Sequence, residues 1–153
     1  MTKLTDVTIF DCEELVRTMR LADQREAIAL RGEAGLGTMD LWRSCQGGTA
    51  YAARTDDGRL ICIFGCTAWP GQAGVGVPWL LGTDLLDRHM LSLCRVARSF
   101  VRAWHDKYPH LTNLTDKRNR RVLRWLRWIG FHFVREVPVG DHTFIQFSSN
   151  RHV

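Results

Sequence analysis

Hydrophobic and polar positions follow either a two-residue or a helical period along most of the chain, so they predict a series of strands and helices. In chain order these are a strand at 6–11, helices at about 12–30 and 36–46, strands at 49–54, 59–69 and 76–81, a helix at about 84–108, a strand at 110–116, a helix at 120–130, and strands at 131–137 and 142–148. This order predicts an α/β fold with a mixed sheet of about seven strands flanked by about four helices.

Several short signals place the ends of these elements. Asp11, with Glu14 three residues later, has the spacing of a capping box and is expected to be the N-cap of the first helix. Asp57-Gly58 suits a tight turn between two strands. Gly130 is expected to close the helix at 120–130 in the C′ position.

The composition suits one globular domain over residues 1–153, because 45% of the residues are hydrophobic and 24% are charged. The chain has no apolar run long enough to cross a membrane and no apolar signal core near its start, which predicts a cytoplasmic protein. Five scattered cysteines fit buried structural thiols in a reducing compartment better than a metal or redox site.

The charge is unevenly distributed. The formal net charge is +5, yet the stretch from Arg88 to Arg127 holds eleven Lys or Arg and two Asp, a net charge of +9. The remainder of the chain therefore carries a net charge of −4. A basic C-terminal half indicates an anionic partner, namely a phosphate-bearing cofactor, a nucleic acid or an acidic protein.

A specific motif lies near the C-terminus, in "NRRVLRWLRWIGF". Asn119 follows a predicted strand and opens a helix, and Gly130 and Phe131 follow it at eleven and twelve residues. With the element order, this resembles the GNAT superfamily of N-acyltransferases. The resemblance implies a GNAT fold, an acetyl-CoA or other acyl-CoA cofactor, and transfer of the acyl group to an amine.

Within the superfamily, the run "WLLGTD…LSLCRVARSF…KYPHLTN…N…RWLRWIGF" most resembles a divergent branch from tailed bacteriophages. That branch includes GNAT-like internal virion proteins of short-tailed phages. The resemblance implies two alternatives: an acyltransferase in the host cytoplasm, or a catalytically degenerate binding module that acts in virion assembly or binds and modulates a host protein.

The cofactor motif of the family departs from its usual form here. "GQAGVG" at 71–76 has a similar glycine pattern, but it precedes the strand at 76–81 and is interpreted as a turn. The position after that strand holds "LLGTDLLDRH", where backbone amides and the helix dipole would meet phosphates, unless Thr83 or Asp84 is simply a helix cap. The candidate cofactor-binding residues are Leu81, Gly82, Thr83, Leu85, Leu86, Arg88 and Asn119.

The catalytic residues are harder to assign. Many family members have a Tyr seven residues after the motif Asn to protonate the leaving thiolate, but Leu126 stands at that position and cannot transfer a proton. Asp84, His89 and Asp116 are the nearest ionisable candidates for a general base. Each also has an ordinary structural interpretation, as a cap, a first-turn helix residue and a turn residue.

The helix at 120–130 is both basic and aromatic. Arg120, Arg124 and Arg127 align on one face, and Val122, Leu126 and Ile129 line another. An amphipathic helix with solvated arginines explains the pattern, as does a face that docks an anion or a protein. Nucleic acid is a third, less favoured partner, because no helix-turn-helix, zinc-finger or aromatic strand motif accompanies the arginines.

Overall fold

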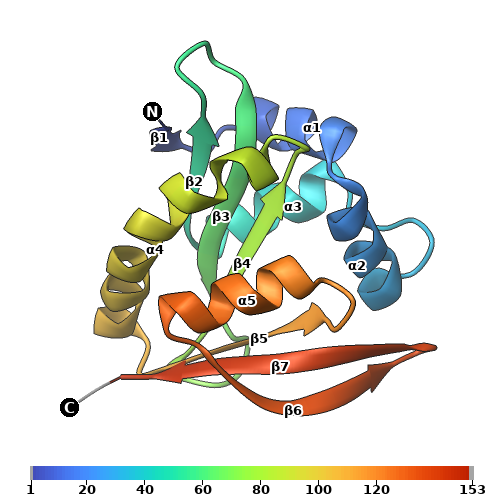
Figure 1. Cartoon of the computed structure of the whole chain (residues 1–153), viewed down its shortest axis with the longest axis vertical. Helices are drawn as coiled ribbons and strands as arrows, with labels where there is room; N and C mark the ends of the chain where they lie inside the picture. Colours follow the sequence, from blue (N-terminus) through green and yellow to red (C-terminus); the bar gives the residue numbers. More distant parts are fainter. Residues whose placement is uncertain (1, 152–153) are drawn as a thin grey trace. The chain divides into compact units, whose positions relative to one another are not determined.

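The computed structural model describes residues 2–151 (Figure 1). Its elements in chain order are β1 (Lys3–Asp6), α1 (Ile9–Thr18), α2 (Leu21–Arg31), α3 (Thr38–Gln46), β2 (Gly48–Arg54), β3 (Leu60–Ala68), β4 (Val75–Gly82), α4 (Leu86–Lys107), β5 (His110–Asp116), α5 (Arg120–Ile129), β6 (His132–Val139) and β7 (His142–Asn150). The seven strands form one mixed sheet in the order β1-β2-β3-β4-β5-β7-β6, which confirms the predicted α/β class.

The chain folds into two compact units. The first comprises residues 1–67 and 79–93, and the second comprises residues 68–78 and 94–153. The boundaries fall inside β4 and α4, so each of these elements contributes residues to both units. Each unit is described in turn.

The first unit is built on the antiparallel strands β1, β2 and β3. β3 is apolar at every position from Leu60 to Cys66, and all seven of these residues are buried, as expected for a central strand covered on both faces. Helices α1 and α3 pack against this strand through Leu15 and Leu41, which are almost completely buried.

The start of the chain differs from the prediction in two ways. The first strand is 3–6 rather than 6–11, and the helix begins at Ile9 because Thr8 is its N-cap. Asp11 is the third helical residue: its backbone N–H donates to Thr8 Oγ1, and its carboxylate accepts the N–H of Thr8. A capping box is therefore present, but it pairs Thr8 with Asp11 rather than Asp11 with Glu14, so it begins three residues earlier than predicted.

The expected helix at 12–30 is two helices, so residues 2–151 contain five helices rather than about four. Met19 and Arg20 between α1 and α2 leave the helical conformation, with ψ values of 134° and 152°. Met19 forms an isolated bridge with Thr83, and the N–H of Arg20 donates to the carbonyl of Gly82 at 2.8 Å. Tertiary pairing breaks the helix here, at a place with no Gly or Pro to signal the break.

The second unit contains the antiparallel strands β5, β7 and β6, with α5 connecting β5 to β6. β7 lies between β5 and β6, and its Phe144 is completely buried. The ring of Phe147 meets that of Phe131 edge to face at 5.1 Å. The amphipathic helix α5 buries Leu126 and Ile129, and Gly130 closes it with φ 109°, as predicted.

The glycine-rich stretch at 71–76 leads into β4, as expected of a turn. Gly71 and Gly74 have positive φ values, and the N–H of Trp69 donates to the carbonyl of Val75 across the turn. All five cysteines are buried, which confirms that part of their interpretation. Within residues 2–151, no helix is both long and apolar enough to cross a membrane, and no cluster of potential metal ligands occurs.

Candidate functional site

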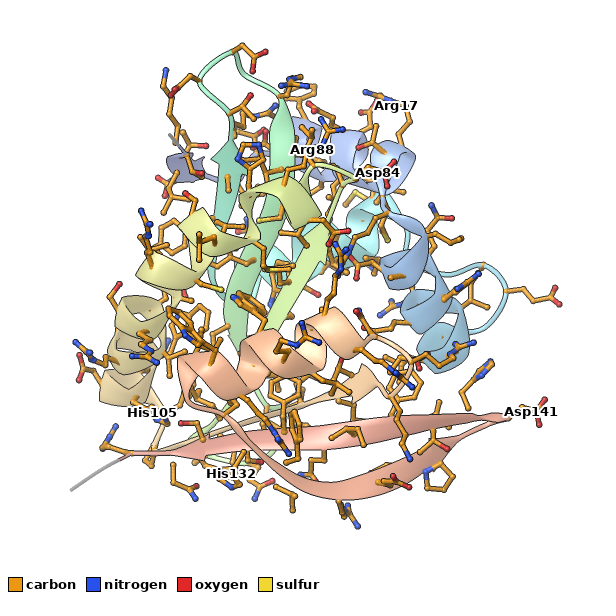
Figure 2. The ribbon with its side chains drawn as sticks, in the orientation of Figure 1. Arg17, Asp84, Arg88, His105, His132 and Asp141 are labelled. Atoms are coloured by element: carbon orange, nitrogen blue, oxygen red, sulfur yellow. The ribbon has the colours of Figure 1, made fainter. Side chains whose placement is uncertain are left out.

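The segment from the end of β4 to the start of α4 carries most of the predicted site residues. It runs from Leu81 to His89 in the first unit, and Figure 2 shows Asp84 at the turn and Arg88 on the first turn of α4. Leu86 is completely buried, whereas Asp84 and Arg88 are exposed and Leu81, Leu85 and His89 are half-buried. The apolar members therefore anchor the segment, and three charged residues, Asp84, Asp87 and Arg88, are exposed.

Most of the backbone amides expected to bind phosphate already have partners inside the protein. The N–H of Gly82 donates to Asp23 Oδ2 at 2.7 Å, and the N–H of Thr83 donates to the carbonyl of Ile61 at 2.9 Å. Two further amides bond within the turn itself: the N–H of Leu85 donates to Thr83 Oγ1, and the N–H of Leu86 donates to the carbonyl of Thr83. Among the described residues, only the Asp84 N–H of these five amides has no recorded partner.

Asp23 meets the end of β4 from helix α2. Its side chain is 2% exposed and forms a double hydrogen bond with Arg20, from Nε at 2.8 Å and from Nη2 at 3.1 Å. Burial acts to lower the pKa of Arg20, but the hydrogen bonds and charge of Asp23 outweigh it and raise that pKa. Arg20 therefore stays charged, and the side chain of Asp23 bonds both to it and to the backbone where the strand ends.

The sequence did not reveal this role of Asp23. Arg20 and Asp23 are three residues apart, a spacing common on solvated helix faces. Gly82 lies 59 residues further along the chain, so no local pattern connects it to Asp23. Asp23 lies in the first turn of α2, where an acidic residue is ordinary, so its position gave no signal of this role.

Gly82 is required at its position because of close packing. A Cβ atom built there would lie 2.5 Å from Leu86 Cδ2 and 2.9 Å from Leu86 Cβ. A side chain at this position would therefore push the first turn of α4 away from the strand. The glycine serves the packing of the strand against the helix, whatever the amide binds.

Asp116 and Asn119 belong to the second unit. Asp116 is 3% exposed and receives the Arg118 side chain, with the Nη2–Oδ2 distance at 2.6 Å. The hydrogen bond from Arg118 holds the pKa of Asp116 below its ordinary value. Such a carboxylate is a weak proton acceptor near neutral pH, which makes Asp116 the least suited of the three base candidates.

Asn119 opens α5, as the motif requires. It is the N-cap residue and is half-buried, and its carbonyl accepts the N–H of Leu123. Its side chain makes no capping hydrogen bond within the described structure. The amide group of Asn119 is therefore not committed to closing the helix.

A second side-chain amide links β5 to β4 within the second unit. The two strands are parallel, with Val75 opposite His110 and Gly76 opposite Leu111. Beyond these positions, Asn113 Nδ2 donates to the carbonyl of Pro78 at 2.8 Å, and Asn113 Oδ1 accepts the N–H of Leu114. The side chain of Asn113 thus replaces a backbone hydrogen bond between the two strands next to Pro78, which has no N–H to donate.

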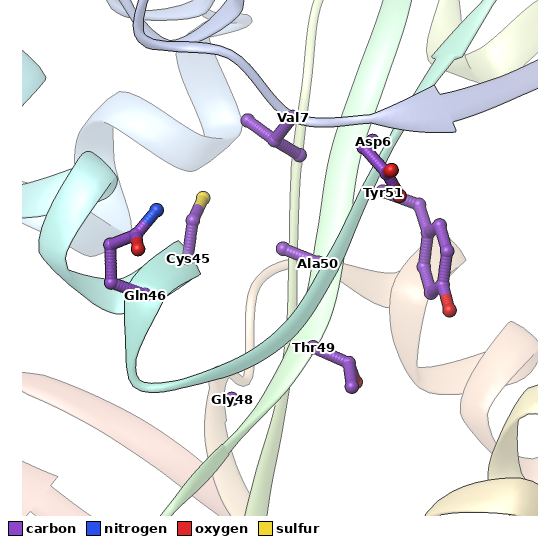
Figure 3. Close-up of a pocket in the computed structure, with 8 residues that line it drawn as sticks. All are labelled: Asp6, Val7, Cys45, Gln46, Gly48, Thr49, Ala50 and Tyr51. Atoms are coloured by element: carbon purple, nitrogen blue, oxygen red, sulfur yellow. The ribbon is translucent and has the colours of Figure 1, made fainter.

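A pocket of about 300 Å³ lies elsewhere in the first unit, against β2 and the end of α3 (Figure 3). Its polar lining includes Asp6, Gln46 and Thr49, and no predicted site residue lines it. Burial raises the pKa of Cys45, also in its lining, to about 12, so this thiol is not a nucleophile near neutral pH. The pocket is therefore lined by polar groups, and the thiol in its lining is not activated.

Comparisons with known proteins agree on the fold. No protein-family model and no curated protein sequence matches the chain. The chain is similar in structure to a GNAT-family acetyltransferase from Streptococcus pneumoniae, with a TM-score of 0.68, 14% identity and coverage of 98% of this chain and 99% of the other. It is also similar to a ribosomal-protein-alanine N-acetyltransferase from Brucella melitensis, with a TM-score of 0.73, 13% identity and coverage of 97% and 99%.

A third similar structure contains ligands. It is a spermidine N-acetyltransferase from Vibrio cholerae in complex with CoA and spermine, with a TM-score of 0.64, 8% identity and coverage of 97% of this chain and 95% of the other. These similarities span nearly all of each chain, but the identities are low. They show that this chain has the GNAT fold.

Proposed function

We propose that the protein binds an acyl-CoA and transfers its acyl group to an amine. The observation that carries the proposal is the match of nearly the whole chain to acetyltransferases of the same fold, one of them holding CoA and an amine. The cofactor would supply an activated thioester. Among the predicted binding groups of the first unit, those available for its phosphates are the amide of Asp84 and the guanidinium of Arg88.

The first of these groups suits an anion. The Asp84 amide precedes the 22-residue helix α4, whose N-terminus carries partial positive charge. Arg88 is exposed on the first turn of this helix and adds a full positive charge. The carboxylates of Asp84 and Asp87 oppose it, so we expect modest affinity rather than tight binding.

The chemistry would depend mainly on positioning. The amine nitrogen bonds to the acyl carbon, the carbon–sulfur bond breaks, and the amine loses a proton. His89 or Asp84 could accept that proton directly or through water. Leu126 cannot protonate the departing thiolate, so that proton comes from water.

The first test is calorimetric titration with acetyl-CoA. Arg88→Glu should weaken binding about tenfold or more, because reversing one phosphate contact costs at least 1.4 kcal/mol. Arg25→Glu is the matched control, since it changes the same charge on exposed α2. Substitution of Gly82 is unsuitable, because the clash with Leu86 would disturb the fold itself.

Turnover would be measured by the release of free CoA thiol over a panel of amines. The five cysteines of the protein are buried and contribute little background while it stays folded. Thiol release that requires both acetyl-CoA and an amine supports the proposal. No binding at millimolar acetyl-CoA would reject it.

A second candidate is a GNAT-fold binding module without catalysis. Two observations favour it: Asp23 occupies the Gly82 amide, and Leu126 stands where an acid would be needed. We place this alternative in a tailed bacteriophage, in virion assembly or against a host protein, on the strength of the run "WLLGTD…RWLRWIGF". Absence of CoA binding, together with recovery of the protein in purified virions or on one host protein, would support it.

A further inference from the structure

Two rows of arginines lie on adjoining helices of the second unit. Here they are called the arginine face, which comprises Arg95, Arg98 and Arg102 of α4 and Arg120, Arg124 and Arg127 of α5. Within each helix the members are three or four residues apart and so share one side. All six side chains are exposed.

The two rows meet at Trp128. Arg98 Nη2 donates to the Trp128 carbonyl at 2.6 Å, and its guanidinium lies 4.5 Å from the centre of the Trp128 ring. The carbonyl belongs to the C-terminal end of α5, where a cation is favourable. The contact joins α4 to α5 and holds a half-exposed tryptophan (49%) beside the arginines.

The arginine face has almost no acidic neighbours. The second unit holds twelve Lys or Arg and four Asp or Glu, a net charge of +8. Asp116 is paired with Arg118 and Glu136 with Lys117, and Asp141 is at the turn between β6 and β7 (Figure 2). Asp106 is the one acidic residue on α5 and on the part of α4 that belongs to the second unit, and within residues 2–151 none of the six arginines forms an ion pair.

We propose that the arginine face binds single-stranded nucleic acid through its phosphates, with Trp128 stacking on a base. Each arginine row is about 10 Å long, since seven residues of helix rise 1.5 Å each. A row of that length matches several consecutive phosphates and exceeds what one free phosphate needs. This inference is independent of acyl transfer and goes beyond it.

Two features select nucleic acid over an acidic protein, and a third bears on sequence preference. All six cations are arginines, whose planar forks bind phosphate in pairs of hydrogen bonds and stack on flat rings. Trp128 offers an exposed aromatic ring next to them, as in single-strand binding sites. The two helical faces carry no Asn or Gln to read adenine, so we expect little sequence preference beyond contacts of arginine with guanine.

The test is fluorescence anisotropy of the full chain with labelled single-stranded RNA and DNA of mixed sequence. With six phosphate contacts, log K should fall with log salt with a slope of about −4. Single strands should bind about tenfold more tightly than duplex, because one stacked base contributes about 1–3 kcal/mol. Trp128→Ala should remove that preference while leaving the salt slope nearly unchanged.

Charge reversal separates the arginine face from net charge. Arg124→Glu with Arg127→Glu should lower affinity at least 100-fold and reduce the slope by about 1.4, since two contacts are lost. Arg25→Glu with Arg43→Glu makes the same change in net charge in the first unit and should keep most of the binding. Circular dichroism and thermal unfolding establish that both variants fold.

Three results would overturn the proposal. The first is no binding at low salt, and the second is equal loss in the two double variants, which would indicate a general charge effect. The third is displacement by poly-glutamate as effective as by single-stranded nucleic acid, which would assign the face to an acidic protein. Duplex bound as tightly as single strands would exclude the stacking role of Trp128.

Discussion

The two units use charge in opposite ways. The first holds nine Lys or Arg and twelve Asp or Glu, a net charge of −3, and several of these charges are paired with one another. Arg20 with Asp23 is buried, and Arg54 binds both Asp11 and Glu14. The second unit has a net charge of +8, with its arginines on the surface and mostly uncharged polar groups inside.

This difference separates charge that builds the fold from charge that is available to a partner. A buried ion pair is costly to break, because removing one member leaves the other charged and desolvated. An exposed arginine contributes little to stability, since water already solvates it. The first unit should therefore be sensitive to charge deletion, and the second tolerant of it.

The largest effect is expected from Asp23→Ala. It leaves Arg20 buried without its partner and the Gly82 amide without an acceptor, and should lower the free energy of unfolding by about 3–5 kcal/mol. Urea denaturation measures this loss. Glu136→Ala, which removes an exposed pair with Lys117 in the second unit, should cost less than about 1 kcal/mol. Similar values for the two variants would contradict the contrast between buried and exposed charge.

The second unit should be sensitive at its buried hydroxyls instead. Thr112 Oγ1 donates to the carbonyl of Phe147 and accepts from Ser148 Oγ and Gln146 Nε2. Thr112→Val keeps the shape but leaves those groups unpaired, for a loss of about 1–2 kcal/mol. Thermal unfolding compares it with Thr143→Val at an exposed position. An unchanged midpoint for Thr112→Val would mean that water replaces the lost bonds.

A smaller effect, visible through pH, is expected at Asp116. Its pKa in the folded protein is below the ordinary 3.8, so its contribution to stability is present above about pH 4 and is lost as the pH falls through the folded pKa. Asp116→Asn should be less stable than the wild type at pH 6, by about 1 kcal/mol or less. The two proteins should converge towards pH 2, and parallel pH curves would rule the pairing out.

The smallest change in stability is expected for Arg124→Ala with Arg127→Ala. Both side chains are exposed, and Arg127 also lies over the Phe133 ring at 4.9 Å. We expect a loss below about 1 kcal/mol by urea denaturation. A loss above about 2 kcal/mol would show that these arginines stabilise the fold, and would contradict the proposal that they are available to a partner.

Most of the fold could be predicted from periodic patterns in the sequence. β5 and α5 agree with their predicted ranges almost residue for residue, because alternation, an amphipathic face and a closing glycine act locally. The break at Met19 and Arg20 was not predictable in this way. It depends on pairing with Thr83 and Gly82, which no nearby residue signals.

The candidate site shows the same limit. Its location after β4 was predictable, because the strand-to-helix junction is marked by a glycine between apolar runs. The occupancy of its amides was not, because Asp23 comes from a distant helix. Similarly, no pattern in the sequence distinguishes Asn113, and only the structure shows its amide bonded to the carbonyl of Pro78.

The contact of Asn113 with Pro78 has a consequence for the evolution of this sheet. Hydrogen bonds between main chains survive almost any substitution, since every residue except proline carries the same two groups. The bond that follows the β4–β5 ladder depends on one side chain, so a single codon change can delete it or restore it. The stability of the β4–β5 junction at this position can therefore be changed by a single substitution at Asn113.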